Sequence, residues 1–155
     1  MKIAIIYSSR TGNTEELVNY VYELFLIHFV KVDLYQVEQF PLSRLMDYDL
    51  VVIGTYTWGD GEIPQEMIPL YEAFENQEVK HMLTGIVGTG DRFYPQFCGA
   101  VNRFRDMLYV QTDLVVTLKV ELSLQRSDME RCHKFIELML KRASRKRVGL
   151  ELRGK

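Results

Sequence analysis

Residues 8–14 form a dense run of small polar side chains around one glycine, Ser8-Ser9-Arg10-Thr11-Gly12-Asn13-Thr14. Hydroxyl and amide groups, with a glycine that lets the backbone curl, can direct several N–H groups toward one anion. The helix predicted to follow adds the partial positive charge of its N-terminus. The run lacks the GxxxxGK[ST] pattern of nucleoside triphosphatases and the GxGxxG pattern of dinucleotide folds. It predicts a cradle for a monophosphate, and a polar helix cap is the competing interpretation.

Two later glycine-rich segments carry aromatic side chains. Trp58, the only tryptophan, is followed by Gly59-Asp60-Gly61, a run that interrupts regular structure. Tyr94 lies in a second such segment, residues 88–100. An aromatic side chain on a loop offers a flat contact surface at a small cost in conformational entropy. Two aromatic loops and a phosphate cradle predict a clamp for a planar ring on a phosphorylated chain, and FMN is such a ligand.

Three segments resemble loops of the flavodoxin family. Residues 9–15 match the phosphate-loop pattern S/T-x-T-G-N-T-E. Residues 57–61, Thr-Trp-Gly-Asp-Gly, and residues 90–101, Gly-Asp-x-x-Tyr-x-x-Phe-Cys-Gly-Ala-Val, are similar to the two loops that cover the faces of the flavin. Three loops in the family's order make the resemblance specific, and it extends over about residues 1–140.

The resemblance implies a low-potential electron carrier, without a substrate of its own, that holds one FMN non-covalently. It implies that Trp58 stacks on the inner face of the flavin and Tyr94 on the outer face. Arg10 stands at the variable position of the phosphate loop, so no family role transfers to it; it points to solvent or contacts the phosphate. Phe93 is expected in the core or at the rim. The remaining candidate cofactor-binding residues are Ser9, Thr11, Gly12, Asn13 and Thr14 at the phosphate, Thr55, Tyr56 and Thr57 at the phosphate and ribityl side, Gly88, Thr89, Gly90 and Asp91 at the pyrimidine edge, and Gly59, Asp60, Phe97 and Cys98.

Two features are expected to tune the cofactor. Gly59 can rotate its peptide, because it has no Cβ, and its carbonyl can then accept a hydrogen bond from the reduced flavin. Acidic residues near the aromatic loops disfavour an anionic reduced flavin, whereas Arg92 softens that effect. We therefore expect Arg92→Glu to lower the reduction potential.

The elements that position these loops follow from hydrophobic periodicity. Strands are predicted over residues 2–7, 31–37, 49–55, 83–88 and 113–121. Helices are predicted over residues 14–28, 65–76 and 98–109, and a last helix begins at a Ser127–Glu130 capping box. This alternation predicts a three-layer α/β/α sandwich, and the flavodoxin resemblance implies a five-stranded parallel sheet of order 2-1-3-4-5. The uninterrupted segment 113–121 lacks the loop that splits the last strand of long-chain flavodoxins, which implies the short-chain class.

Length, composition and charge limit the other possibilities. A chain of 155 residues with 47% hydrophobic residues fits one domain. It has no signal-peptide core and no apolar run long enough to cross a bilayer, so we expect a cytoplasmic monomer. Residues 141–155 hold seven of the 19 basic residues and one of the 21 acidic residues. We interpret residues 1–140 as the FMN-binding domain and 141–155 as a basic helix end, with an acidic partner or nucleic acid as a weaker alternative.

Other functions of the same fold remain compatible with parts of the sequence. An activator of ribonucleotide reductase shares the fold and FMN, but Trp58 with Gly59-Asp60 argues against it. A cofactor-free receiver domain needs an acidic cluster after the first strand, where this chain has Ser8 and Ser9. A quinone reductase is a third possibility. Cys98 and Cys132 have no metal-ligand spacing, so no metal is expected. The expected protein partners are an NAD(P)H- or ferredoxin-dependent reductase and redox acceptors.

Overall fold

Five parallel strands form one sheet in the computed structural model, which describes residues 1–28 and 30–154. Their order, β2-β1-β3-β4-β5, confirms the predicted topology. The strands are β1 (Ile3–Tyr7), β2 (Asp33–Gln36), β3 (Leu50–Thr55), β4 (Leu83–Gly90) and β5 (Asp113–Glu121). The helices are α1 (Asn13–Ile27), α2 (Ile68–Asn76), α3 (Gly99–Gln111) and α4 (Arg126–Arg153), with short 3-10 helices η1 (Val37–Gln39), η2 (Leu42–Asp47) and η3 (Gln65–Met67).

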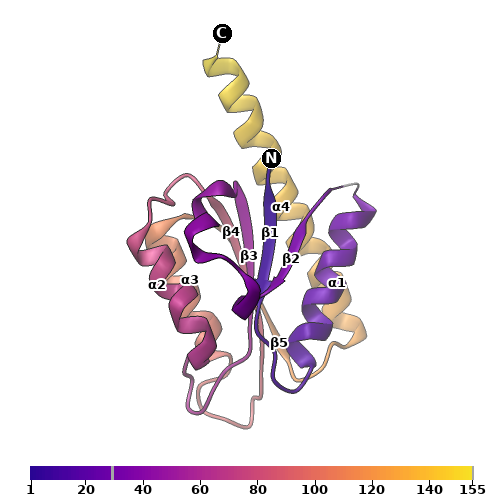
Figure 1. Cartoon of the computed structure of the whole chain (residues 1–155). Helices are drawn as coiled ribbons and strands as arrows, with labels where there is room; N and C mark the ends of the chain where they lie inside the picture. The colour runs from indigo at the N-terminus through magenta and orange to yellow at the C-terminus, as the bar shows by residue number, and fades with distance from the viewer. Residues whose placement is uncertain (29, 155) are drawn as a thin grey trace.

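Two apolar cores separate the sheet from its helices. Helices α1 and α4 cover one face, and α2 and α3 cover the other (Figure 1). Every residue of β1 and β3 is buried, because central strands of a doubly covered sheet have no solvent face. Phe25 and Phe135 fill the first core, and Phe74 and Phe104 fill the second. The result is the predicted three-layer sandwich.

Several predicted boundaries differ from the structure. The helix predicted over residues 65–76 begins as the 3-10 turn η3 and becomes α-helical only at Ile68. Strand β2 is shorter than residues 31–37 because pairing with β1 involves Asp33–Gln36 alone. The capping box of α4 is formed by Gln125 and Asp128, so the prediction of Ser127 and Glu130 was wrong. Gln125 has the extended backbone of an N-cap, and its N–H donates to Asp128 Oδ2 at 2.9 Å.

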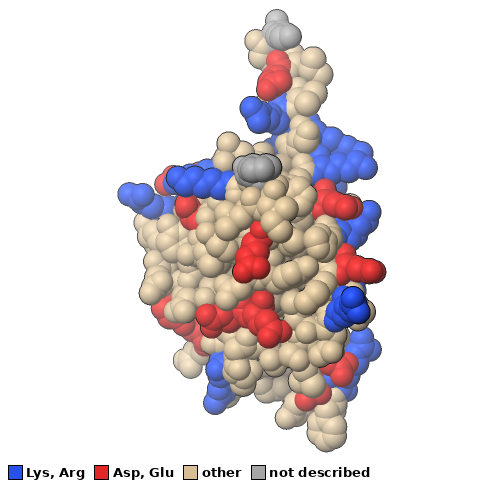
Figure 2. Space-filling model, turned by 90° about the vertical axis from the view of Figure 1, so that its right-hand side faces the viewer, with Lys and Arg blue, Asp and Glu red and all other residues tan. Residues whose placement is uncertain are grey.

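Helix α4 continues well past the sheet. Its buried residues end at Ala143, and the following turns extend from the edge of the body opposite to the carboxyl ends of the strands (Figure 1). In Figure 2, Lys and Arg side chains gather where α4 leaves the body. Residues 141–153 are thus helical, and Lys155 of the predicted basic end lies outside the described residues. None of the described helices is both long and apolar enough to cross a membrane.

Candidate functional site

The loops that follow β1, β3, β4 and β5 meet at one edge of the sheet, where parallel strands all end. They enclose a cavity of about 830 Å³. A cavity of this size is within the range of small-molecule and cofactor sites. It is lined by Arg10, Thr11, Asn13, Tyr56, Thr57, Trp58, Gly59, Asp60, Thr89, Gly90, Asp91, Tyr94, Pro95, Gln96, Cys98 and Leu122. Thirteen of these were predicted from the sequence.

The loop after β1 turns into α1 through Gly12. Its φ of 97° is in the left-handed region, and a Cβ there would have nothing within 4 Å. The turn therefore needs glycine for its conformation and leaves open space beside the backbone. Ser9 Oγ accepts the Glu15 N–H at 3.1 Å, which holds the loop against the first turn of the helix. An open, N–H-rich helix start suits an anionic group.

Trp58 stands on a tight hairpin after β3. Its N–H donates to the Glu62 carbonyl at 2.8 Å, and the Glu62 N–H donates back at 2.7 Å. Gly59 and Gly61, inside the hairpin, both have positive φ, 51° and 85°. Trp58 is 45% exposed, which confirms that this tryptophan is not a core residue. The hairpin presents an indole at the wall of the cavity.

The loop after β4 supplies the second aromatic wall. Tyr94 is 55% exposed and lines the cavity, whereas Phe93 is 86% exposed and stands outside it. Phe93 thus lies at the rim and not in the core. The rings of Phe93 and Tyr94 meet edge to face at 5.7 Å. Asp91 shapes the turn, because its Oδ1 accepts the Phe93 N–H at 2.9 Å.

Six predicted site residues reach this edge of the sheet but do not line the cavity. Ser9 and Gly12 shape the phosphate loop, as described above. Thr14 is buried, and its hydroxyl lies 2.7 Å from that of Thr89. The remaining three residues pack inside the protein. Thr55 is buried, and its hydroxyl donates to the Tyr56 carbonyl at 2.7 Å. Gly88 is buried in β4, and Phe97 packs against the core that α2 and α3 cover.

Glu66 connects two of the loops and was missed by the sequence analysis. Its Oε1 accepts the Ser8 hydroxyl at 2.7 Å and the Tyr56 hydroxyl at 2.6 Å. Burial raises the pKa of Glu66, but these two hydrogen bonds and the charge of Arg10 outweigh burial and lower it below the ordinary value. Burial and the same contact raise the pKa of Tyr56 to about 12. Glu66 is therefore a carboxylate that braces Ser8 against the start of the Trp58 loop.

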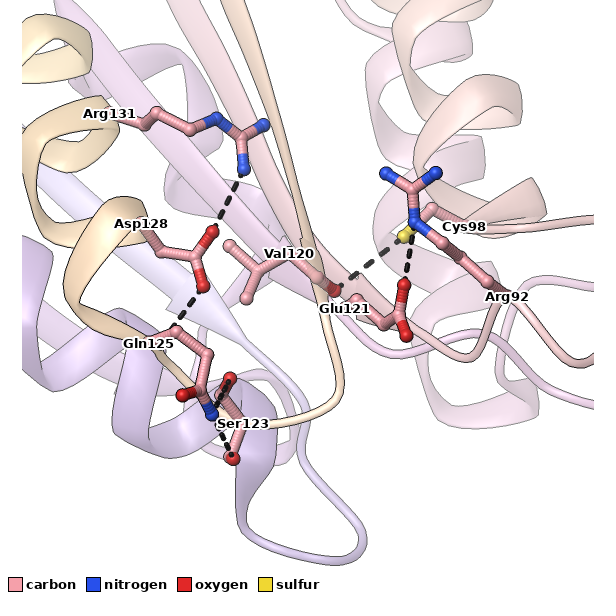
Figure 3. A network of polar contacts seen from close by, with 8 residues as sticks. All are labelled: Arg92, Cys98, Val120, Glu121, Ser123, Gln125, Asp128 and Arg131. Atoms are coloured by element: carbon pink, nitrogen blue, oxygen red, sulfur yellow. Dashed lines mark hydrogen bonds and ion pairs between the residues drawn. The ribbon is translucent and has the colours of Figure 1, made fainter.

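The end of β5 completes the cavity wall, and Figure 3 shows its polar contacts. Leu122 lines the cavity with a φ of 54°, and its N–H donates to the Gly90 carbonyl at 2.8 Å. Arg92 Nε lies 2.6 Å from Glu121 Oε2, and the Arg92 guanidinium also lies over the Phe97 ring. Arg92 does not line the cavity. Pro95 and Gln96, also missed, belong to the Tyr94 loop.

The two cysteines are buried, and burial raises the pKa of each thiol to about 11. Cys98 has an αL backbone at the N-cap of α3 and directs its Sγ toward the Val120 carbonyl at 4.0 Å (Figure 3). High pKa values keep both groups protonated at neutral pH, so neither is suited to thiol redox chemistry. Among the described residues, no cluster of His, Cys, Asp or Glu is arranged to hold a metal ion.

A phosphate-type cradle and two exposed aromatic rings around one cavity, at the carboxyl edge of a doubly wound sheet, define a nucleotide-binding α/β protein. The flavodoxin family model matches residues 5–135, and the chain belongs to the flavodoxin family. Flavodoxins bind FMN and transfer electrons with it, so the chain is an FMN-bound electron carrier and not an enzyme with its own substrate. The family assignment removes the receiver-domain alternative.

Individual relatives agree with this assignment. Probable flavodoxin 1 of Bacillus subtilis is 36% identical over 137 residues, which cover 86% of this chain and 87% of the relative. A structure of oxidised flavodoxin 2 from Bacillus cereus has a TM-score of 0.85 at 32% identity and covers 92% of this chain and 99% of its own. A short-chain flavodoxin associated with a bacterial microcompartment has a TM-score of 0.86 at 28% identity, with the same two coverages. With β5 uninterrupted over Asp113–Glu121, the chain is of the short-chain class.

Proposed function

We propose that the cavity between the loops after β1, β3 and β4 is the FMN site, and that the chain uses it to pass electrons from a reductase to acceptor proteins. FMN, when bound, supplies a ring that accepts and releases electrons. The observation that carries the proposal is the single cavity shared by Thr11, Trp58 and Tyr94, one residue from each of the three loops. A ligand with a phosphate group and a flat ring needs a polar helix start and aromatic side chains in one site.

The phosphate end of the proposed site is the start of α1. Thr11 and Asn13 line the cavity there, and Gly12 leaves space beside the backbone. The helix dipole favours a dianion without a dedicated lysine. Thr57 lines the same cavity, and its Oγ1 accepts the Ala100 N–H at 3.4 Å. Ser9 and Thr14 do not line the cavity, and they support the site by holding the phosphate loop in shape.

The ring end is formed by Trp58 and Tyr94, with the backbone of residues 89–91 at the polar edge. Aromatic walls exclude water from both faces of a ring and stabilise it by stacking. Gly59 lines the cavity with a φ of 51°, and a residue without a Cβ allows the peptide rotation that would offer its carbonyl to a ring N–H. The partial exposure of both rings leaves an edge of the ligand accessible to a partner protein.

We also propose a reductase as the electron donor and the cytoplasm as the compartment. An NAD(P)H- or ferredoxin-dependent reductase is the proposed donor, because an electron carrier of this family takes its electrons from another protein. Two free cysteines, buried and unpaired in a disulfide, support a reducing compartment, the cytoplasm. The exposed rim around Tyr94 and Phe93 is the proposed contact surface for these partners.

FMN titration of the cofactor-free protein tests the site. We expect saturable binding, with an absorbance band of bound flavin, and a loss of roughly tenfold in affinity for Trp58→Ala or Tyr94→Ala. Tyr109→Ala is the control, because Tyr109 is also an exposed aromatic residue but lies on α3 and does not line the cavity. A protein that stays colourless with excess FMN, or variants that bind FMN as the wild type does, would overturn the proposed site.

A further inference from the structure

Arg10 and Trp58 come from different loops and meet at the wall of the cavity. The Arg10 guanidinium carbon lies 4.3 Å from the centroid of the Trp58 ring. Both side chains line the cavity and both are exposed. A guanidinium over an indole face at this distance is a cation–π contact, and tryptophan is the strongest aromatic partner for it. The contact joins the phosphate loop to the hairpin that carries the ring wall.

We propose that Arg10 is a positioning residue for the cofactor ring: it stacks on one face of Trp58, fixes the orientation of the indole and leaves the opposite face for the flavin. This inference rests on the proposed FMN site. It assigns a role to the variable position of the phosphate loop, where the family pattern assigns none. It also places that role at the ring end of the ligand and not at the phosphate end.

The surroundings of Arg10 support a stacking role over an ionic one. Among the described residues, Arg10 takes part in no ion pair within 4.0 Å, although Arg92 and Arg105 both do. The nearby Glu66 carboxylate is held by the hydroxyl groups of Ser8 and Tyr56, and Arg10 influences it only at longer range. The closest defined partner of the guanidinium is therefore the indole.

Fixing Trp58 has a consequence for affinity. Backbone hydrogen bonds with Glu62 hold the main chain of the Trp58 hairpin, but the indole itself is 45% exposed, and the Arg10 guanidinium is the contact defined for its ring. A ligand that stacks on a mobile indole must order it, and this ordering weakens binding. An indole that Arg10 has already ordered strengthens binding of the flavin ring, whether or not the ligand carries a phosphate. Arg10 should therefore raise the affinity for FMN and for riboflavin by the same factor.

Binding of FMN and of riboflavin to Arg10→Gln tests the proposal. We expect both ligands to bind more weakly by the same factor, roughly two- to fivefold, which corresponds to an exposed cation–π contact. Arg10→Lys keeps the charge but loses the planar stack, so it should recover only part of the affinity. Arg44→Gln is the matched control, an exposed arginine of η2 that does not line the cavity, and should bind both ligands normally. Loss of FMN affinity alone would show that Arg10 pairs with the phosphate and would overturn the proposal, as would unchanged affinities.

Tryptophan fluorescence provides a second readout that needs no ligand. Trp58 is the only tryptophan, so the emission of the FMN-free protein reports on it alone. We expect Arg10→Gln to lower the fluorescence anisotropy and to raise acrylamide quenching, whereas Arg44→Gln leaves both unchanged. Identical anisotropy and quenching in Arg10→Gln and wild type would overturn the proposal. Wild-type protein that binds neither ligand would instead refute the FMN site on which the proposal rests, and the two failures are therefore distinguishable.

Discussion

The hydroxyl oxygens of Thr14 and Thr89 lie 2.7 Å apart, which joins the first turn of α1 to the end of β4 at the candidate FMN site. Both residues are buried, at 1% and 4% exposure. One hydroxyl donates and the other accepts, so each satisfies the other away from water. The contact holds the phosphate loop at a fixed distance from the loop of Tyr94.

Breaking this pair is expected to destabilise the fold. Thr89→Val removes one partner and leaves the Thr14 hydroxyl buried without its hydrogen bond, which lowers the free energy of unfolding by about 1–3 kcal/mol. Urea denaturation of the FMN-free protein measures the change. The double variant Thr14→Val/Thr89→Val removes both hydroxyls and should recover part of the loss. Equal stability of the single variant and the wild type would show that the hydrogen bond does not contribute.

Two glycines of very different environment provide a matched pair. Gly88 of β4 has no room for a Cβ, because the added atom would lie 2.6 Å from the Thr55 carbonyl oxygen and would overlap Val101. We expect Gly88→Ala to lower the free energy of unfolding by about 1–3 kcal/mol or to displace β4 from β3. Gly149→Ala, on the exposed part of α4, meets no atom within 4 Å and should raise helix stability by about 0.5–1 kcal/mol. Urea denaturation distinguishes them, and a stable Gly88→Ala protein would contradict the close packing of β3 on β4.

The sequence was sufficient to predict the parts of the site that local residue types determine. Small polar residues around Gly12, and a tryptophan beside Gly59, favour loops because of their own residue types. The strand order then brings those loops together. Thirteen of the cavity residues were predicted, most of them because the three loops resemble those of flavodoxins. The individual roles of these residues in FMN binding remain predictions.

The missed features all depend on tertiary distances. Glu66 follows Pro64 as an ordinary helix-start acid in the sequence, and only the fold places it between Ser8 and Tyr56. Leu122 reaches the cavity because β5 ends beside Gly90, which no local pattern indicates. The capping box of α4 was assigned to Ser127 because serine is the more common cap, but Gln125 has the extended backbone at the true start.

The Glu66 carboxylate predicts a dependence of stability on pH. Its folded pKa is lower than its unfolded pKa, since hydrogen bonds from Ser8 and Tyr56 and the charge of Arg10 outweigh the opposing effect of burial. A group of this kind stabilises the folded state fully above its unfolded pKa and loses that contribution as pH falls through its folded pKa. We expect Glu66→Gln to reduce stability at pH near 7 and to make the loss between about pH 5 and 3 less steep than in wild type. Urea denaturation across this range measures both slopes, with Glu72→Gln on α2 as an exposed control. Parallel slopes for Glu66→Gln and wild type would contradict the assigned shift.

The ion pair of Arg92 with Glu121 limits how strongly Arg92 can act on the flavin. Its 2.6 Å contact places an opposite charge beside the guanidinium, and both side chains are largely exposed, at 71% and 44%. Arg92→Glu replaces a cation by an anion in the Tyr94 loop, so it should disfavour electron uptake and lower the midpoint potential of the bound FMN. Charges as exposed as these interact by about 0.2–1 kcal/mol, which is roughly 10–40 mV for one electron. Redox titration measures this shift.

Glu121→Gln is the matched opposite variant for the same titration, because it removes the anion and leaves Arg92 unpaired. It should raise the midpoint potential, by a smaller amount since only one charge is changed. Both shifts should diminish at 1 M salt, where the Debye length falls to about 3 Å. The two variants leave the described hydrogen bonds of Trp58 and the contacts of Arg10 intact, so their FMN affinity in the oxidised form should stay close to that of the wild type. A shift of the same sign in both variants would mean that the rim acts through loop structure and not through charge.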